Sequence, residues 1–69
     1  MSVAEHVAKF LNDNKGRGFC DNCIKIRVKL ARPQEAQQAA SALAATDAFL
    51  RAEAHCAGCG GMKKVTWAK

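Results

Sequence analysis

The chain has 69 residues and a mass of 7.4 kDa, a length that fits one small domain over residues 1–69. About half of the residues are hydrophobic, but fourteen are alanines and four are cysteines. Such a short chain buries too little surface to enclose an ordinary substrate pocket, and domains of this size usually need a metal or disulfides for stability. No apolar run approaches the roughly 20 residues of a membrane helix, and residues 1–6 lack the pattern of a secretory leader. We therefore expect a cytoplasmic domain that does not span a membrane.

The net charge of +5 is unevenly distributed along the chain. Residues 15–32 hold one acid, Asp21, among six basic residues: Lys15, Arg17, Lys25, Arg27, Lys29 and Arg32. A local excess of positive charge suits a polyanionic partner such as nucleic acid. The alternative explanation is charge that only keeps a small protein soluble.

The first predicted element is a helix that begins after Ser2. Ser2 and Glu5 have the spacing of a capping box, in which each side chain satisfies a backbone group of the first turn. The apolar residues recur on one helical face, namely Val3, Val7, Phe10 and Leu11. A turn-rich stretch over residues 12–16 ends this helix, and residues 16–19 leave room only for a brief extended piece.

The first cysteine pair, Cys20-Asp21-Asn22-Cys23, follows directly. Asp21 and Asn22 are residues that cap helices, so they predict a helix start that places Cys23 near a positive helix terminus, where a thiolate is favoured. Residues 24–30 are ambiguous by themselves, because Ile24, Ile26, Val28 and Leu30 alternate with basic residues as in a strand. The predicted cap favours a helix instead.

A further helix is predicted from Pro33 to Ala45, since proline suits a first helical turn and the segment is rich in helix-forming residues. Its small buried face consists of Ala36, Ala39, Ala40 and Leu43. Its polar side consists of Gln34, Gln37, Gln38 and Ser41.

The last part of the chain predicts a β-hairpin. Leu50, Ala52 and Ala54 alternate with polar residues over 49–55, which predicts a strand with these three on its apolar face. Residues 65–67, Val-Thr-Trp, form its natural antiparallel partner. The second cysteine pair, Cys56 and Cys59, lies between the two strands and is followed by Gly60 and Gly61, the build of a zinc knuckle.

The two C-x-x-C pairs, Cys20/Cys23 and Cys56/Cys59, are separated by 32 residues and predict one shared tetrahedral metal site. Zinc is the favoured ion, in a structural role because four ligands close the coordination shell; iron at four thiolates stays open. A disulfide framework lacks the compartment it needs, and a redox dithiol does not account for two pairs. His55, beside Cys56, is expected on a strand face or behind the ligands.

The resulting order is helix, short extended piece, helix, helix, hairpin, and it resembles a winged helix-turn-helix domain of the α+β class. The resemblance uses residues 24–30 as the second helix, 31–35 as the turn into the third and 49–53 as the entry to the wing. Small bacterial proteins with a cysteine pair before the turn and another in the wing look similar. In such a fold, zinc would tie the wing, a hairpin of marginal stability alone, to the helical body.

The resemblance implies DNA binding, with the third helix in the major groove and the wing along the backbone. Glutamine can pair with adenine, and lysine and arginine can contact phosphates. The candidate nucleic-acid contacts are Arg27, Arg32, Gln34, Gln37, Gln38, Ser41, Lys63 and Lys64. Because residues 33–45 contain no lysine or arginine, a zinc-stabilised adaptor that binds another protein is the alternative.

Other functions are less well supported. With four aromatic residues, all of them core candidates, the chain offers no stacking platform for RNA. No catalytic constellation or phosphate-binding loop is evident, so we do not expect an enzyme. A reversible zinc sensor is disfavoured by the tight binding expected of four thiolates, whereas a redox switch through zinc release by oxidation stays open as a lesser alternative. The apolar stripe of the first helix is accounted for by the core, so a monomer is favoured over a dimer.

Overall fold

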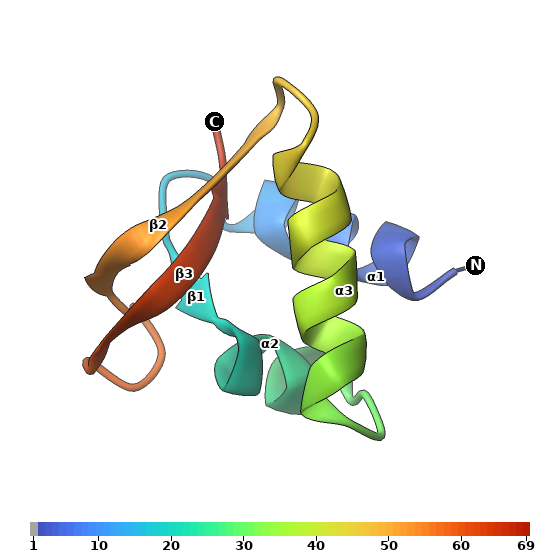
Figure 1. The fold of residues 1–69 in the computed structure, drawn as a ribbon, viewed down its shortest axis with the longest axis horizontal. Coiled ribbons are helices and arrows are strands. Elements are labelled where there is room, and N and C mark those ends of the chain that lie inside the picture. Colours follow the sequence, from blue (N-terminus) through green and yellow to red (C-terminus); the bar gives the residue numbers. More distant parts are fainter. Residues whose placement is uncertain (1) are drawn as a thin grey trace.

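The computed structural model describes residues 2–69, which form three helices and a three-stranded antiparallel sheet. The elements are α1 (Val3–Asp13), β1 (Phe19–Cys20), α2 (Asp21–Val28), α3 (Pro33–Ala44), β2 (Phe49–His55) and β3 (Met62–Ala68). Their order matches the predicted one. The helices gather on one side of the sheet, and α1 and α2 both pack against α3 (Figure 1). Within residues 2–69, no helix has the length and apolar character needed to cross a membrane.

Helix α1 forms as its sequence predicts. The Ser2 hydroxyl accepts a hydrogen bond from the backbone N–H of Glu5 at 3.2 Å, which satisfies one free donor of the first turn. Val7 and Leu11 are completely buried, and Val3 and Phe10 pack against the same core. The stripe predicted from residue spacing is therefore the core-facing side of α1.

Helix α2 resolves the ambiguity of residues 24–30, although its boundaries differ from those predicted. It begins at Asp21, with Cys20 rather than Asp21 or Asn22 in the capping position, and no side chain caps it. It ends at Val28 because Lys29 adopts a left-handed conformation, φ 62°, and the Leu30 N–H closes the end on the Lys25 carbonyl. A helix buries Ile24 and leaves Ile26 63 % exposed, whereas a strand would place both on one face.

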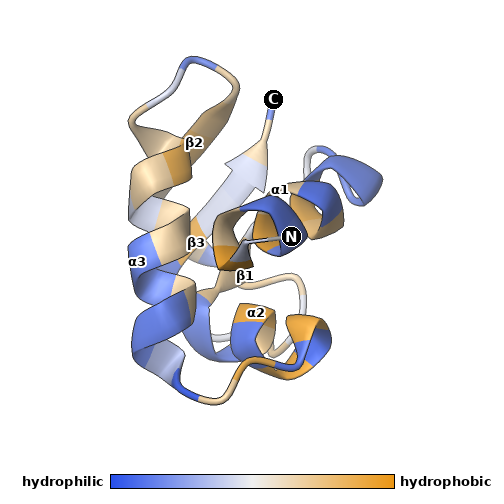
Figure 2. Ribbon diagram, turned by 90° about the vertical axis from the view of Figure 1, so that its right-hand side faces the viewer, coloured by the Kyte–Doolittle hydropathy of each residue, from blue (hydrophilic) through white to orange (hydrophobic). Residues whose placement is uncertain are grey.

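Helix α3 begins at Pro33 with Arg32 as its N-cap, so the last three residues of the predicted turn, 33–35, are helical. The small buried side chains of Ala36, Ala39 and Ala40 allow α1 and α2 to lie close to it. Leu43 is only partly buried at the edge of this core. The hydrophilic residues of α3 are concentrated in its first half (Figure 2).

The sheet has the strand order β1-β3-β2, and the predicted hairpin of β2 and β3 is confirmed from Phe49↔Ala68 to His55↔Met62. The predicted faces of β2 are wrong for residues 49–52, whereas Ala54, on the predicted apolar face, is partly buried against the core. Phe49 is buried and Arg51 is half-buried on the helix-facing side, whereas Leu50 and Ala52 are exposed on the outer side. The burial of Phe49 decides which face of β2 is turned to the helices, because a strand that buries this ring must turn its even-numbered residues to the other face.

Candidate metal centre

Four cysteine sulfurs meet where the hairpin turn reaches the junction of β1 and α2. The Sγ atoms of Cys20, Cys23, Cys56 and Cys59 all lie within 4.8 Å of one another. The closest recorded approaches are 3.5 Å between Cys56 and Cys23 and 3.9 Å between Cys20 and Cys59. Tetrahedral zinc with bonds of about 2.3 Å requires sulfurs about 3.8 Å apart. The four cysteines are therefore placed to coordinate one metal ion.

The first pair is held by secondary structure on both sides of it. Cys20 ends β1, where it is opposite Val65 of β3, and Cys23 lies in the first turn of α2. Both are buried. A strand that passes directly into a helix thus supplies a C-x-x-C pair without the glycine turn of a knuckle.

The second pair is held by a tight turn. The Cys56 N–H donates to the Gly61 carbonyl, and the Gly60 N–H donates to the Cys56 carbonyl at 2.8 Å. Gly60 has φ +78°, the left-handed region that glycine adopts without strain. Gly58 is also required for space, because a Cβ atom there would lie 2.9 Å from the Cys23 sulfur. This turn therefore fits closely over the first pair.

Backbone hydrogen bonds to sulfur favour the Cys56 thiolate. Burial raises the pKa of Cys56, but N–H groups of Cys20, Cys59 and Gly58 outweigh it and lower that pKa to about 6. The N–H groups of Cys20 and Gly58 both lie 3.3 Å from this sulfur. For Cys23, burial and the neighbouring thiols raise the pKa. A bound cation would favour deprotonation of all four thiols.

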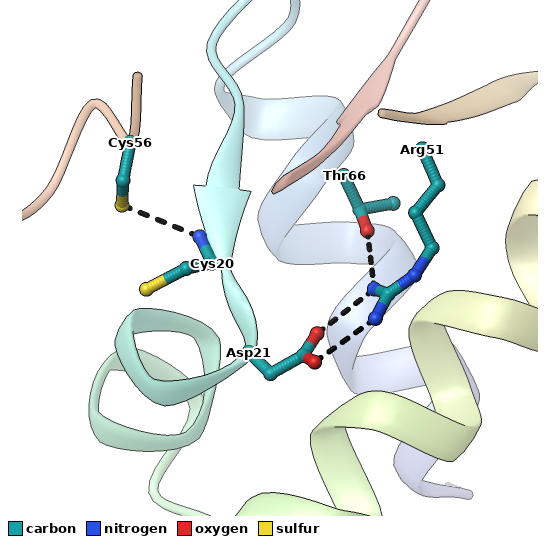
Figure 3. A network of polar contacts seen from close by, with 5 residues as sticks. All are labelled: Cys20, Asp21, Arg51, Cys56 and Thr66. Atoms are coloured by element: carbon teal, nitrogen blue, oxygen red, sulfur yellow. Dashed lines mark hydrogen bonds and ion pairs between the residues drawn. The ribbon is translucent and has the colours of Figure 1, made fainter. Parts of the chain in front are cut away.

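An ion pair that the sequence did not predict lies next to this centre. The Arg51 guanidinium donates to both carboxylate oxygens of Asp21, at 2.8 and 2.9 Å, and to the Thr66 hydroxyl at 2.9 Å (Figure 3). Hydrogen bonding to Asp21 raises the pKa of Arg51. The network joins the residue after Cys20 to β2 and β3. Its sequence signal was weak: Asp21 is the only acid in a basic stretch, and Arg51 is inconspicuous on a strand.

His55 lies outside the cysteine cluster. It is exposed at the end of β2, and its Nδ1 atom is 3.4 Å from the Gly60 carbonyl. This position agrees with the predicted strand face.

The predicted nucleic-acid contacts are all exposed: Arg27, Arg32, Gln34, Gln37, Gln38, Ser41, Lys63 and Lys64. Arg32 and the four polar residues belong to α3 or its cap, whereas Arg27 lies on α2 over the Phe19 ring, 5.4 Å from its centroid. Lys63 and Lys64 are opposite Ala54 and Glu53, so they project from opposite faces of the hairpin. Only Lys64 shares the face that carries the helices.

Comparison with known proteins adds no relative: no family model, no curated protein sequence and no solved structure matches this chain.

Proposed function

We propose that this protein is a non-catalytic, zinc-stabilised winged-helix module that binds duplex DNA. The observation that carries the proposal is the arrangement of its elements, in which α3 follows α2 across a short turn and a hairpin extends beside it. The element order also supports the proposal, because a short strand, β1, lies between the first two helices and the hairpin of β2 and β3 follows α3. Zinc would serve as a closed structural ion that attaches the hairpin to α2.

The exposed side of α3 is the proposed reading surface. Gln34, Gln37, Gln38 and Ser41 follow one another at helical spacing and remain exposed in the folded chain. Their amide and hydroxyl groups can donate and accept hydrogen bonds at base edges, as adenine recognition by glutamine requires. No lysine or arginine occurs within α3, so phosphate contacts must come from its surroundings.

The surroundings of α3 supply that charge. Arg32 caps the start of α3 and is exposed, and α2 carries Lys25 and Arg27 in its last turn. On the hairpin, Lys64 shares the helix-facing side of β3 and Lys63 is on the other side. A duplex that contacts α3 would therefore meet Lys64 more readily than Lys63.

The test measures binding of the zinc-loaded protein to labelled duplex DNA by fluorescence anisotropy over a series of salt concentrations. We expect log K to fall with log salt, and Lys64→Ala to reduce the slope by about 1, as expected for one lost phosphate contact. Lys63→Ala is the matched control, since it removes the same charge one residue away and is expected to change the slope less. Absence of salt-dependent binding by the metal-loaded protein would contradict the proposal.

One observation favours the adaptor alternative. An open, mainly apolar groove of about 350 Å³ lies between the start of α1 and α3, and it is lined by Ser2, Val3, Ala4, Glu35, Gln38, Ala39 and Ala42. Such a groove suits an apolar side chain of a protein partner. Substituting Gln37 with alanine separates the two roles, because Gln37 does not line the groove. If α3 contacts DNA, Gln37→Ala should weaken binding to DNA. If the protein is an adaptor that uses the groove, Gln37→Ala should leave its affinity for the protein partner unchanged.

A further inference from the structure

Strand β2 forms one border of the sheet. In the order β1-β3-β2, β3 lies in the middle, and β2 pairs with β3 alone among the strands of residues 2–69 (Figure 1). The ladder runs without interruption over all seven residues from Phe49 to His55. This border therefore offers a regular strand edge for pairing.

The hydrogen bonds at both ends of the hairpin identify the backbone groups that face outward. The Cys56 N–H donates to the Gly61 carbonyl at 2.9 Å, and the Lys69 N–H donates to the Ala48 carbonyl at 3.0 Å. Because bonded and non-bonded pairs alternate in an antiparallel ladder, the even-numbered residues of β2 bond to β3. The N–H and C=O groups of Phe49, Arg51, Glu53 and His55 therefore point away from it.

Three of the usual protections of a strand border are missing from β2. Proteins commonly protect an edge strand with proline, lysine or a bulge, and β2 has none of these. The side chain of Arg51 turns inward to Asp21 and is only 10 % exposed. On the outer face, Leu50 is 41 % exposed and Ala52 is also exposed.

We propose that β2 pairs antiparallel with β2 of a second copy of this chain, forming one continuous sheet across a two-fold axis. The charges of the strand select the register. Centring the pair on Arg51 or on Glu53 would set like charges opposite each other, which is unfavourable. Centring it on Ala52 separates the two Glu53 carboxylates and sets each one opposite the partner's Arg51, which stays bonded to Asp21 within its own chain. In the same register, Leu50 lies opposite the partner's Ala54, so the outer face continues as an apolar surface.

This pairing is independent of DNA binding, because it uses the sheet border and no residue of α3. It also differs from the monomer favoured by the sequence alone. That expectation considered only the apolar stripe of α1, which the core does bury. The alternation of residues 49–55 predicts two faces of a strand and carries no information on which strand lies at the edge of the sheet.

The first experiment measures the mass of the zinc-loaded full chain by sedimentation equilibrium from micromolar to millimolar concentration. We expect a reversible monomer–dimer equilibrium. Glu53→Pro removes an outward N–H without removing a bond to β3, so this variant is expected to stay monomeric with an intact hairpin. Glu53→Arg places like charges opposite each other at two positions and is expected to weaken the dimer roughly tenfold. Asp13→Arg is the matched control, because it makes the same change of charge at the last residue of α1, outside β2.

Amide hydrogen exchange gives a second readout that requires no variant. The N–H groups of Arg51 and Glu53 are expected to become protected as the protein concentration rises. Those of Ala52 and Ala54, bonded within the hairpin, are expected to be protected at every concentration. A chain that stays monomeric at millimolar concentration with unprotected Arg51 and Glu53 amides overturns the proposal, as does a Glu53→Pro variant that folds and still dimerises. If Glu53→Pro does not fold, Glu53→Arg and the exchange pattern decide.

Discussion

The two ends of this molecule are stabilised by different interactions. Where α1 crosses α3, the contact consists of apolar side chains, with Val7 and Leu11 of α1 and Ala36 and Ala40 of α3 completely buried. Where the hairpin turn meets α2, the side chains brought together are four cysteines and, behind them, an ion pair. The helical end is held by hydrophobic burial, whereas the cysteine end is held by an ion pair and has four cysteines placed to coordinate a metal ion.

The comparison shows how a domain of 69 residues extends a small core. A two-stranded hairpin is marginally stable by itself, and the distal half of this hairpin buries few side chains between Glu53 and Lys64. A metal ion bound at its turn would replace the apolar contacts that a longer chain would supply. The ends should therefore respond differently to the following changes.

Metal removal is expected to have the largest effect. Zinc bound by folded four-ligand sites contributes about 10–16 kcal/mol of binding free energy. We expect chelation to lower the melting temperature sharply and to expose amides around Cys20 and Cys56, while the α1–α3 contact retains more protection. Native mass spectrometry should first show one ion per chain and free thiols only after its removal. Visible absorbance would identify iron instead of zinc, and a metal-free chain with two disulfides would contradict the metal centre.

Leu11→Ala should destabilise the helical end without affecting the metal. Leu11 is completely buried, so its truncation leaves a cavity and costs about 3 kcal/mol. Chemical denaturation of the loaded protein measures the loss, and metal stoichiometry should remain unchanged. Ile26→Ala, at a 63 % exposed position, is the control and should cost less than about 0.5 kcal/mol. A loss of metal in Leu11→Ala would show that the two ends are not separable.

Arg51→Met should have the next largest effect, at the cysteine end. It leaves the Asp21 carboxylate unpaired and the buried Thr66 hydroxyl without its guanidinium donor. Because Asp21 is 25 % exposed, we expect about 2 kcal/mol, below the loss for a fully buried pair. Asp21→Asn and the double variant complete a double-mutant cycle. The pair is shown to be coupled if the double variant is less destabilised than the sum of the single ones.

Gly58→Ala is expected to have the smallest effect of the four, and it acts on the fit between the cysteine pairs. A Cβ atom at Gly58 would approach the Cys23 sulfur to 2.9 Å, so the turn must shift. We expect roughly tenfold weaker metal affinity in competition with a chelating dye, which corresponds to about 1.4 kcal/mol. Gly61→Ala is the matched control from the same turn, because its nearest neighbour is a flexible lysine carbon at 3.5 Å. Equal losses in both variants would contradict the steric explanation.

Local signals in the sequence predicted most of the fold. The capping residues and apolar stripe of α1, the proline at the start of α3 and the hairpin around the second cysteine pair depend on neighbouring residues. C-x-x-C spacing likewise predicted which side chains would meet. The helix signals each lie within one element, and the two cysteine pairs, 32 residues apart, were predicted to meet because one tetrahedral ion takes four ligands.

The features that the sequence did not predict depend on contacts between distant segments. Residues 24–30 alternate like a strand, but packing of Ile24 into the core selects a helix. The faces of β2 were inverted because the burial of Phe49 and the partner of Arg51, which is 30 residues away, cannot be read from the alternation. The predicted cap failed for the same reason, since the Asp21 carboxylate binds Arg51 and leaves the end of α2 uncapped.

The unequal hydrogen bonding of the sulfurs has a consequence for chemical damage. The Cys56 sulfur is buried and accepts N–H groups from two directions, whereas Cys59 is exposed. Hydrogen bonds withdraw electron density from a metal-bound thiolate and so reduce its nucleophilicity, and burial limits access to it. Alkylating or oxidising reagents should therefore attack the loaded centre first at Cys59. The turn would then come away from α2 at its outermost residue, while Cys20, Cys23 and Cys56 still hold the ion.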